Sequence, residues 1–125
     1  MAVGIEVAVI TGSRQSLITH RMQQLGIQHY FSGQLNKQHA YDQLKQSLQL
    51  TNQQFAYIGD DLPDLPIIQQ VGLGVAVNNA VDEVKNYADW VVSKRGGHGA
   101  VREVCDFILT AQNKMQTALG NYCAI

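Results

Sequence analysis

Short apolar runs alternate along this chain with longer segments in which apolar residues recur every three or four positions. The runs are typical of strands that are buried on both faces of a sheet, and the longer segments are typical of amphipathic helices. This alternation predicts an α/β fold with a parallel sheet flanked by helices. The predicted strands are residues 5–10, 27–31, 55–58, 75–77 and 89–92.

Helices are predicted between these strands and after the last of them. Their spans are 14–25, 37–48, a short segment after Pro63, 81–87, and 100 to about 118. Gly26 stands where the first helix would end, Thr51 and Gln54 have the spacing of a capping box, and Trp90 is most simply a core residue. We expect residues 1–118 to form one domain and 119–125 to form a flexible tail.

Composition narrows the class of protein. The chain has 125 residues, a formal net charge of −1, and 15% charged residues, against roughly 25% in an average soluble domain. A basic nucleic-acid-binding protein is therefore excluded. Hydrophobic residues make up 46% of the sequence, which is enough for a modest core and excludes a disordered chain.

The sequence predicts a cytoplasmic protein with no membrane partner. It has no apolar run near the roughly 20 residues that cross a bilayer, and the first ten residues lack a basic signal region. We expect Cys105 and Cys123 to be reduced thiols. His20, His29 and His39 show no metal-ligand spacing with one another or with cysteine.

Three carboxylates gather in the segment Gly59-Asp60-Asp61-Leu62-Pro63-Asp64, at the end of a predicted strand. Carboxylates so close together repel one another, and a hard cation such as Mg²⁺ most often compensates. The structural alternative is that Asp61 caps a helix and that Asp64 lies in its first turn. That alternative does not explain Asp60, so we favour the metal site.

Two further groups are candidates for binding an anion. Thr11, Gly12 and Ser13 follow the first strand, where a hydroxyl and free N–H groups at a helix start bind phosphate, although Thr and Ser are also ordinary helix caps. Lys37 begins a predicted helix, where its charge opposes the helix dipole. A bound anion would explain this placement, but an ordinary surface lysine explains it equally well. The glycine-rich loop 96–99 is either a ligand loop or a plain connection.

Taken in order, Val9-Ile10-Thr11-Gly12, Asn36-Lys37 and Tyr57-Ile58-Gly59-Asp60-Asp61-Leu62-Pro63-Asp64 resemble motifs II, III and IV of the haloacid dehalogenase-like phosphatases. Within that family they are most similar to the phosphatases of 3-deoxy-D-manno-octulosonate 8-phosphate, an intermediate of lipopolysaccharide synthesis. The resemblance continues through loop 96–99 and into the last helix. It implies a Rossmann-like fold and a Mg²⁺-dependent hydrolase of a small sugar phosphate.

The resemblance also implies a role for each candidate residue. Thr11 and Gly12 would contact the phosphate, Lys37 would neutralise it and the phosphorylated intermediate, and Asp60 would bind Mg²⁺. Asp61 and Asp64 would be supporting carboxylates. These roles amount to the electrostatic part of phosphoryl transfer.

The sequence departs from the family pattern in three places. Ser13 and His98 stand where the family usually has basic residues, and no Asp-x-Asp, the motif I that supplies the nucleophile, occurs in the 125 residues. The resemblance therefore implies a preceding segment that contains motif I, the central strand and a hairpin that forms tetramers. We expect the 125 residues to be inactive and poorly stable alone, and a homo-oligomer to form if that segment is supplied. The alternative is a non-catalytic anion- and metal-binding or assembly module of the same fold.

Overall fold

The computed structural model describes residues 4–12, 20–21, 23–27, 29–33, 36–94 and 99–112. From β2 onward, helices and strands alternate along these residues, as the sequence pattern predicts. Their order is β1 (Ala8–Ile10), β2 (His29–Phe31), α2 (Lys37–Leu48), the 3-10 turn η1 (Asn52–Gln54), β3 (Ala56–Gly59), the 3-10 turn η2 (Leu62–Asp64), α3 (Leu65–Gln70), β4 (Leu73–Ala76), α4 (Asp82–Tyr87), β5 (Trp90–Val91) and α5 (Ala100–Ala111).

The described strands form two parallel sheets. β1 pairs with β2, with Ala8 opposite His29, and β4 pairs with β3 on one side and β5 on the other. All three strand pairs are parallel, so the predicted α/β class with a parallel sheet is confirmed. The two sheets are not hydrogen-bonded to each other through the described strands.

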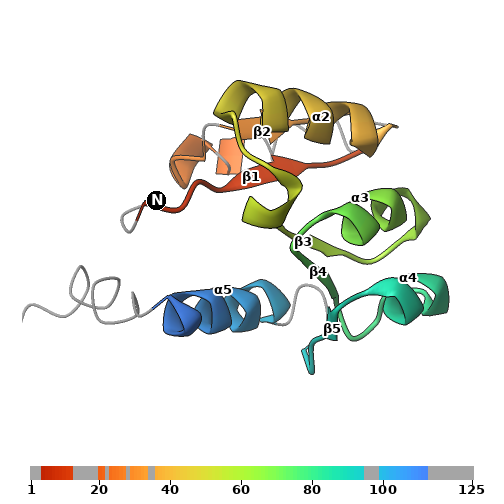
Figure 1. Cartoon of the computed structure of the whole chain (residues 1–125). Helices are drawn as coiled ribbons and strands as arrows, with labels where there is room; N and C mark the ends of the chain where they lie inside the picture. The colour runs from red at the N-terminus through yellow and green to blue at the C-terminus, as the bar shows by residue number, and fades with distance from the viewer. Residues whose placement is uncertain are drawn as a thin grey trace, which may run out of the picture.

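The larger core surrounds β4. Figure 1 shows α3 and α4 on one side of the three-stranded sheet and α5 on the other. Each of these helices contributes an almost fully buried residue to the same cluster, namely Ile68, Val84 and Val104, and β4 contributes Val75, which is completely buried. β4 is therefore covered on both faces, as a strand in a parallel sheet requires.

Helix α2 begins and ends at strong local signals. The Asn36 side chain caps it by accepting the His39 N–H, and Gln49 ends it in the left-handed conformation with φ 54°. Its buried face includes Tyr41, whose ring meets Phe55 edge to face at 5.1 Å between centroids. The start at Lys37 agrees with the predicted start.

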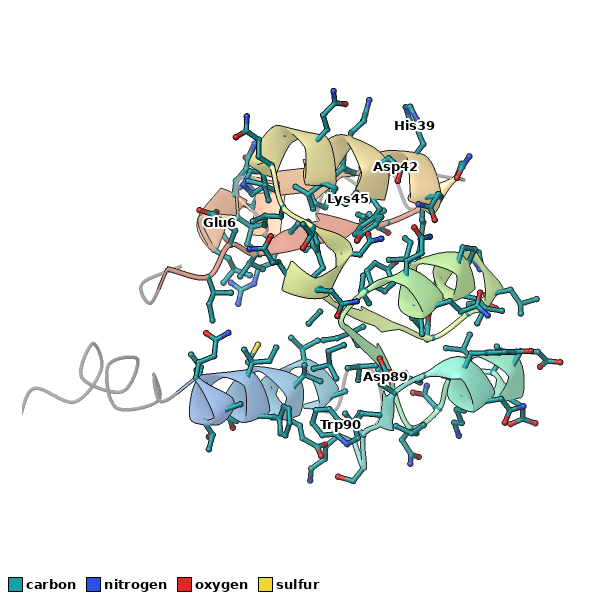
Figure 2. The ribbon with its side chains drawn as sticks, viewed as in Figure 1. Glu6, His39, Asp42, Lys45, Asp89 and Trp90 are labelled. Carbon is teal, nitrogen blue, oxygen red and sulfur yellow. The ribbon has the colours of Figure 1, made fainter. Side chains whose placement is uncertain are left out.

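Several predicted details are confirmed, and others need correction. Thr51 and Gln54 form the expected capping box, and Gly26 has a positive φ of 73°. Trp90, expected in the core, packs against the core cluster but is only partly buried. Its ring also meets the half-exposed Phe107 in a tilted arrangement, with 4.9 Å between ring centroids, beside α5 in Figure 2. The strands are shifted or shortened by one to three residues where they meet loops.

Some predictions fall outside the described residues. These include most of the first helix, Ser13, Cys123, His98, and the end of the last helix with the tail that follows it. Within the described part, Cys105 is an exposed free thiol. None of the helices described is long and apolar enough to span a membrane.

Candidate active site

The carboxylate of Asp64 is the centre of a hydrogen-bonded group that joins α2 to the segment after β3. Asp64 is 2% exposed. Its Oδ1 accepts hydrogen bonds from the Lys37 ammonium at 2.9 Å and the Tyr57 hydroxyl at 2.5 Å. Its Oδ2 accepts the backbone N–H groups of Asp60 at 3.0 Å and Asp61 at 3.2 Å. Four donors therefore compensate the cost of burying this charge.

The local sequence explains how Asp64 comes so close to the strand. A Cβ atom at Gly59 would lie 2.4 Å from the Cβ of Asp64, so only glycine fits there. Asp61 caps the turn η2 by accepting the Leu62 N–H at 2.8 Å, and Pro63 occupies the first turn. The chain therefore reverses direction within a few residues and returns the Asp64 side chain to the end of β3.

The carboxylates of Asp60 and Asp64 have opposite pKa shifts. Burial alone would raise the pKa of Asp64, but the hydrogen bonds from Tyr57, Lys37 and the Asp60 backbone outweigh it and hold this pKa below its ordinary value. The pKa of Asp60 is raised, first by partial burial and then by the neighbouring Asp64 carboxylate, and the charge of Lys37 offsets only part of this. A cation bound beside Asp60 would compensate the charge of both carboxylates.

Tyr57 responds to the same environment. Burial, and after it the hydrogen bond and charge of Asp64, raise the pKa of Tyr57 far above its ordinary value. Its hydroxyl consequently stays protonated and acts as a donor to Asp64. The sequence pattern assigned no role to Tyr57, because an aromatic residue in a strand is typical of a core position. The only sequence signal for a role of Tyr57 is that its ring carries a hydroxyl group and that Asp60, Asp61 and Asp64 follow within a few residues.

Lys37 occupies the first residue of α2, and its side chain is 18% exposed. The sequence pattern left open whether a bound anion explains a cation at this position. The structure supplies an anion from within the chain, because Asp64 pairs with the ammonium across 27 residues of sequence. Among the described residues Asp64 is the acceptor of this ammonium, so two of its three N–H bonds remain for a further acceptor. The other lysine of α2, Lys45, donates a hydrogen bond to the Asn52 side chain instead. Figure 2 labels Lys45 and shows that His39 points outward from the same helix.

Thr11 and Gly12 lie directly after β1, at the carboxyl end of the two-stranded sheet. The Thr11 N–H donates to the Phe31 carbonyl at 2.9 Å, and Gly12 is exposed. Ile10, the residue before them, packs against the cluster of Tyr41, Ile67 and Val71, which also receives Tyr57. The two predicted phosphate-contacting residues are thus placed at the end of a strand that shares a core cluster with α2 and β3.

Of the three carboxylates in the segment 60–64, that of Asp60 is the most available to a magnesium ion. The Asp61 carboxylate caps η2, and all four acceptor positions of Asp64 are used. The described residues contain no group of three His, Cys, Asp or Glu side chains that could enclose a metal. Mg²⁺ commonly binds one or two carboxylates and keeps several waters, so the carboxylate of Asp60 suits it.

Comparison with known proteins identifies the family. The sequence pattern of the haloacid dehalogenase-like hydrolases matches residues 30–104, which is more than half of the chain. The chain belongs to the haloacid dehalogenase-like hydrolase family. The match includes Lys37 and all three carboxylates of the candidate site.

Individual members of the haloacid dehalogenase-like family are similar over nearly the whole chain. The 3-deoxy-D-manno-octulosonate 8-phosphate phosphatase KdsC of Yersinia pestis is 50% identical over 116 residues, which are 93% of this chain and 62% of that protein. A Legionella pneumophila structure assigned to the HAD superfamily of hydrolases, subfamily III A, has a TM-score of 0.95 at 59% identity, and covers 98% of this chain and 67% of its own. The chain thus spans about 62% of the length of its curated relatives.

A third relative was solved with ligands. The 3-deoxy-D-manno-octulosonate 8-phosphate phosphatase of Moraxella catarrhalis, in complex with a magnesium ion, a phosphate ion and a KDO molecule, has a TM-score of 0.90 at 39% identity. The alignment covers 96% of this chain and 69% of that one. The haloacid dehalogenase-like fold predicted from the sequence is therefore confirmed by relatives of known structure.

Proposed function

We propose that this chain forms the phosphate-neutralising and magnesium-binding part of a phosphatase that hydrolyses 3-deoxy-D-manno-octulosonate 8-phosphate to the free sugar acid and phosphate. The observation that supports it is the Lys37 ammonium held by Asp64 beside the carboxylate of Asp60. One cationic and one anionic group are thereby available at one end of β3. Relatives with that activity, one of them solved with magnesium and phosphate, support the choice of substrate.

In this proposal each residue has a separate electrostatic task. Lys37 directs its two remaining N–H bonds to oxygens of the transferring phosphoryl group and offsets their charge. Thr11 and Gly12 offer hydrogen bonds to the same group from the end of β1. Asp60 would hold Mg²⁺, which when bound supplies further positive charge at the phosphate oxygens. Asp61 shapes the loop by capping η2, and Asp64 holds Lys37.

The nucleophile is not among these residues. No Asp-x-Asp occurs in the 125-residue sequence, and the reaction of this family requires a carboxylate nucleophile. We therefore propose that sequence outside these residues supplies it, and that the 125 residues alone bind ligands without turnover. The homo-oligomeric assembly expected from the resemblance stays a prediction.

Binding and turnover test different parts of the proposal. Isothermal titration of the 125-residue chain with MgCl₂ is expected to show binding that Asp60→Asn abolishes and that the matched control Asp61→Asn keeps, because asparagine preserves the helix cap. Titration with inorganic phosphate is expected to show binding that Lys37→Gln weakens and Lys45→Gln, on the same helix, does not. Unchanged magnesium affinity in Asp60→Asn would remove Asp60 from the site.

Turnover separates the phosphatase from the alternative, a non-catalytic binding module. Phosphate release from the sugar phosphate with Mg²⁺ is expected to be absent for the 125 residues and present when the polypeptide is extended by an upstream segment containing Asp-x-Asp. Release by the 125 residues alone would contradict the assignment of the nucleophile to another segment. Binding without turnover in the extended protein would favour the non-catalytic module.

A further inference from the structure

One carboxylate oxygen of Asp64 is shared by two donors. Oδ1 of Asp64 accepts both the Lys37 ammonium at 2.9 Å and the Tyr57 hydroxyl at 2.5 Å, while Oδ2 is fully used by two backbone N–H groups. A carboxylate has about four lone-pair positions, and all of them are occupied here. Asp64 therefore has no free lone pair for a cation at the neighbouring Asp60.

The two donors to Oδ1 differ in rigidity. Tyr57 lies on β3, opposite Gly74 of β4, and its ring packs against both core clusters, the one around Val75 and the one around Tyr41. The position of its hydroxyl is thus set by the core. Lys37 reaches the same oxygen through a flexible four-carbon stem. Of the two, the ammonium is the donor that can shift toward a ligand.

Removing only the tyrosine hydroxyl would have two consequences at Asp64. One lone pair of Oδ1 would become free, and a cation held by Asp60 could use it as a second carboxylate ligand. Lys37 would then be the remaining donor to Oδ1, and that oxygen would hold the ammonium more firmly. The first change favours a cation, whereas the second disfavours a bound anion.

We propose that Tyr57 is a positioning residue whose hydroxyl keeps Asp64 out of the cation's ligand set and keeps the Lys37 ammonium available to phosphate. This inference rests on the proposed function, since it assumes a cation at Asp60 and an anion at Lys37. Phenylalanine at position 57 would fill the core and pair in the sheet equally well, so neither burial nor strand pairing requires the hydroxyl group of Tyr57.

The test is a pair of matched variants titrated with MgCl₂ alone and with inorganic phosphate alone. Tyr57→Phe is expected to bind Mg²⁺ about threefold to tenfold more tightly and phosphate weaker by a similar factor, the scale of one hydrogen bond. The control is Tyr41→Phe on α2, which also loses a buried hydroxyl bond, that to Asn52 at 2.6 Å. It is expected to keep both wild-type affinities, because Asn52 is not part of the site.

Opposite changes in the two affinities distinguish positioning from a general loss of structure, which would weaken both. Equal weakening of both, no change in either, or loss of the wild-type circular dichroism spectrum in Tyr57→Phe would each overturn the inference and leave the proposed function standing. If the wild-type chain binds neither probe, the proposed function fails, and this inference fails with it.

Discussion

The molecule contains two units that differ in the burial of their best-covered strand. In the three-stranded unit, which comprises β3 to α5, the β4 residues Val75 and Ala76 are completely buried. In the two-stranded unit, which comprises β1, β2 and α2, every strand residue is only partly buried. Both units are built from parallel strands and short apolar runs, so composition does not explain the difference.

The number of neighbouring strands and helices explains the difference in burial. β4 has a strand on each side and helices on each face, whereas among the described elements β1 has one partner strand, β2. β3 likewise pairs on one side, with β4. A strand is buried only when both its edges and both its faces are covered. An apolar run therefore predicts a strand, but its burial depends on elements elsewhere in the fold.

The two units meet along a seam made largely by α2 and α3. Tyr41 of α2 packs against Ile67 of α3 and against Val71, the residue that follows α3, and Gln38 of α2 exchanges side-chain hydrogen bonds with Gln70. The ion pair between Lys37 and Asp64 lies on this seam as well. The candidate active site is thus also one of the connections between the two units.

The largest effect is expected from shortening an isoleucine in each unit. Ile68→Ala empties part of the cluster around β4 and should lower the free energy of unfolding by about 2 to 5 kcal/mol. Ile10→Ala removes the same atoms from partly buried β1 and should cost about 1 to 2 kcal/mol. Urea denaturation followed by circular dichroism measures both. Equal losses would contradict the difference in burial between the units.

The next effect tests the seam. Asp64→Asn weakens the ion pair with Lys37 and the bonds to Oδ1, and should lower the free energy of unfolding at pH 7 by about 1 to 3 kcal/mol. Because the pKa of Asp64 is depressed in the folded chain, its contribution is present above the ordinary carboxyl pKa of 3.8 and is lost as the pH falls through the folded value. Urea denaturation between pH 7 and pH 3 should therefore show the difference from wild type shrinking toward the acid end. A difference that is constant with pH would contradict the charge-based explanation.

Local sequence predicted the elements better than their contacts. The start of α2 at Lys37 and the capping box of Thr51 depend on residues within a few positions of one another, and both are confirmed. The cap at Asp61, which the sequence offered only as the alternative to a metal site, is present as well. The pairing of Lys37 with Asp64 spans 27 residues, and the burial of Trp90 depends on how far α5 covers it. Such contacts follow from the packing of whole elements, which periodicity does not specify.

In the candidate site, too, the sequence predicted local features better than contacts between distant residues. The motif order assigned roles to Lys37, Asp60 and Asp64, and the structure places Lys37 and Asp64 in contact with Asp60 beside them. It did not predict that Asp64 satisfies Lys37 internally or that Tyr57 completes the group. Both depend on Gly59, since any side chain there would prevent Asp64 from reaching the end of β3.

A smaller effect is expected at the cap of α2, in the two-stranded unit. Asn36→Ala removes the side-chain oxygen that accepts the His39 N–H at 3.3 Å, and should cost about 1 kcal/mol. Asn36→Asp, which keeps a capping oxygen, is the matched control and should remain near wild type. If the two-stranded unit opens before the rest, hydrogen exchange should show Asn36→Ala accelerating exchange in α2 and leaving β4 unchanged. Uniform acceleration in both would show that the units unfold as one.

The smallest effect has the opposite sign to that of Asp64 and concerns its neighbour. The pKa of Asp60 is raised in the folded chain, so its charged form opposes folding. The contribution of Asp60 to stability is therefore most favourable below the ordinary value of 3.8 and falls as the pH rises through the folded pKa. Asp60→Asn should therefore make the chain slightly more stable than wild type at pH 7 in EDTA, and the gain should vanish near pH 3. Asp61→Asn is the control, since asparagine keeps the cap of η2. Added MgCl₂ should reverse the order, because a cation bound at Asp60 stabilises only the wild type. A loss of stability in Asp60→Asn without metal would mean that this carboxylate supports the fold, and its place at the seam would then be structural.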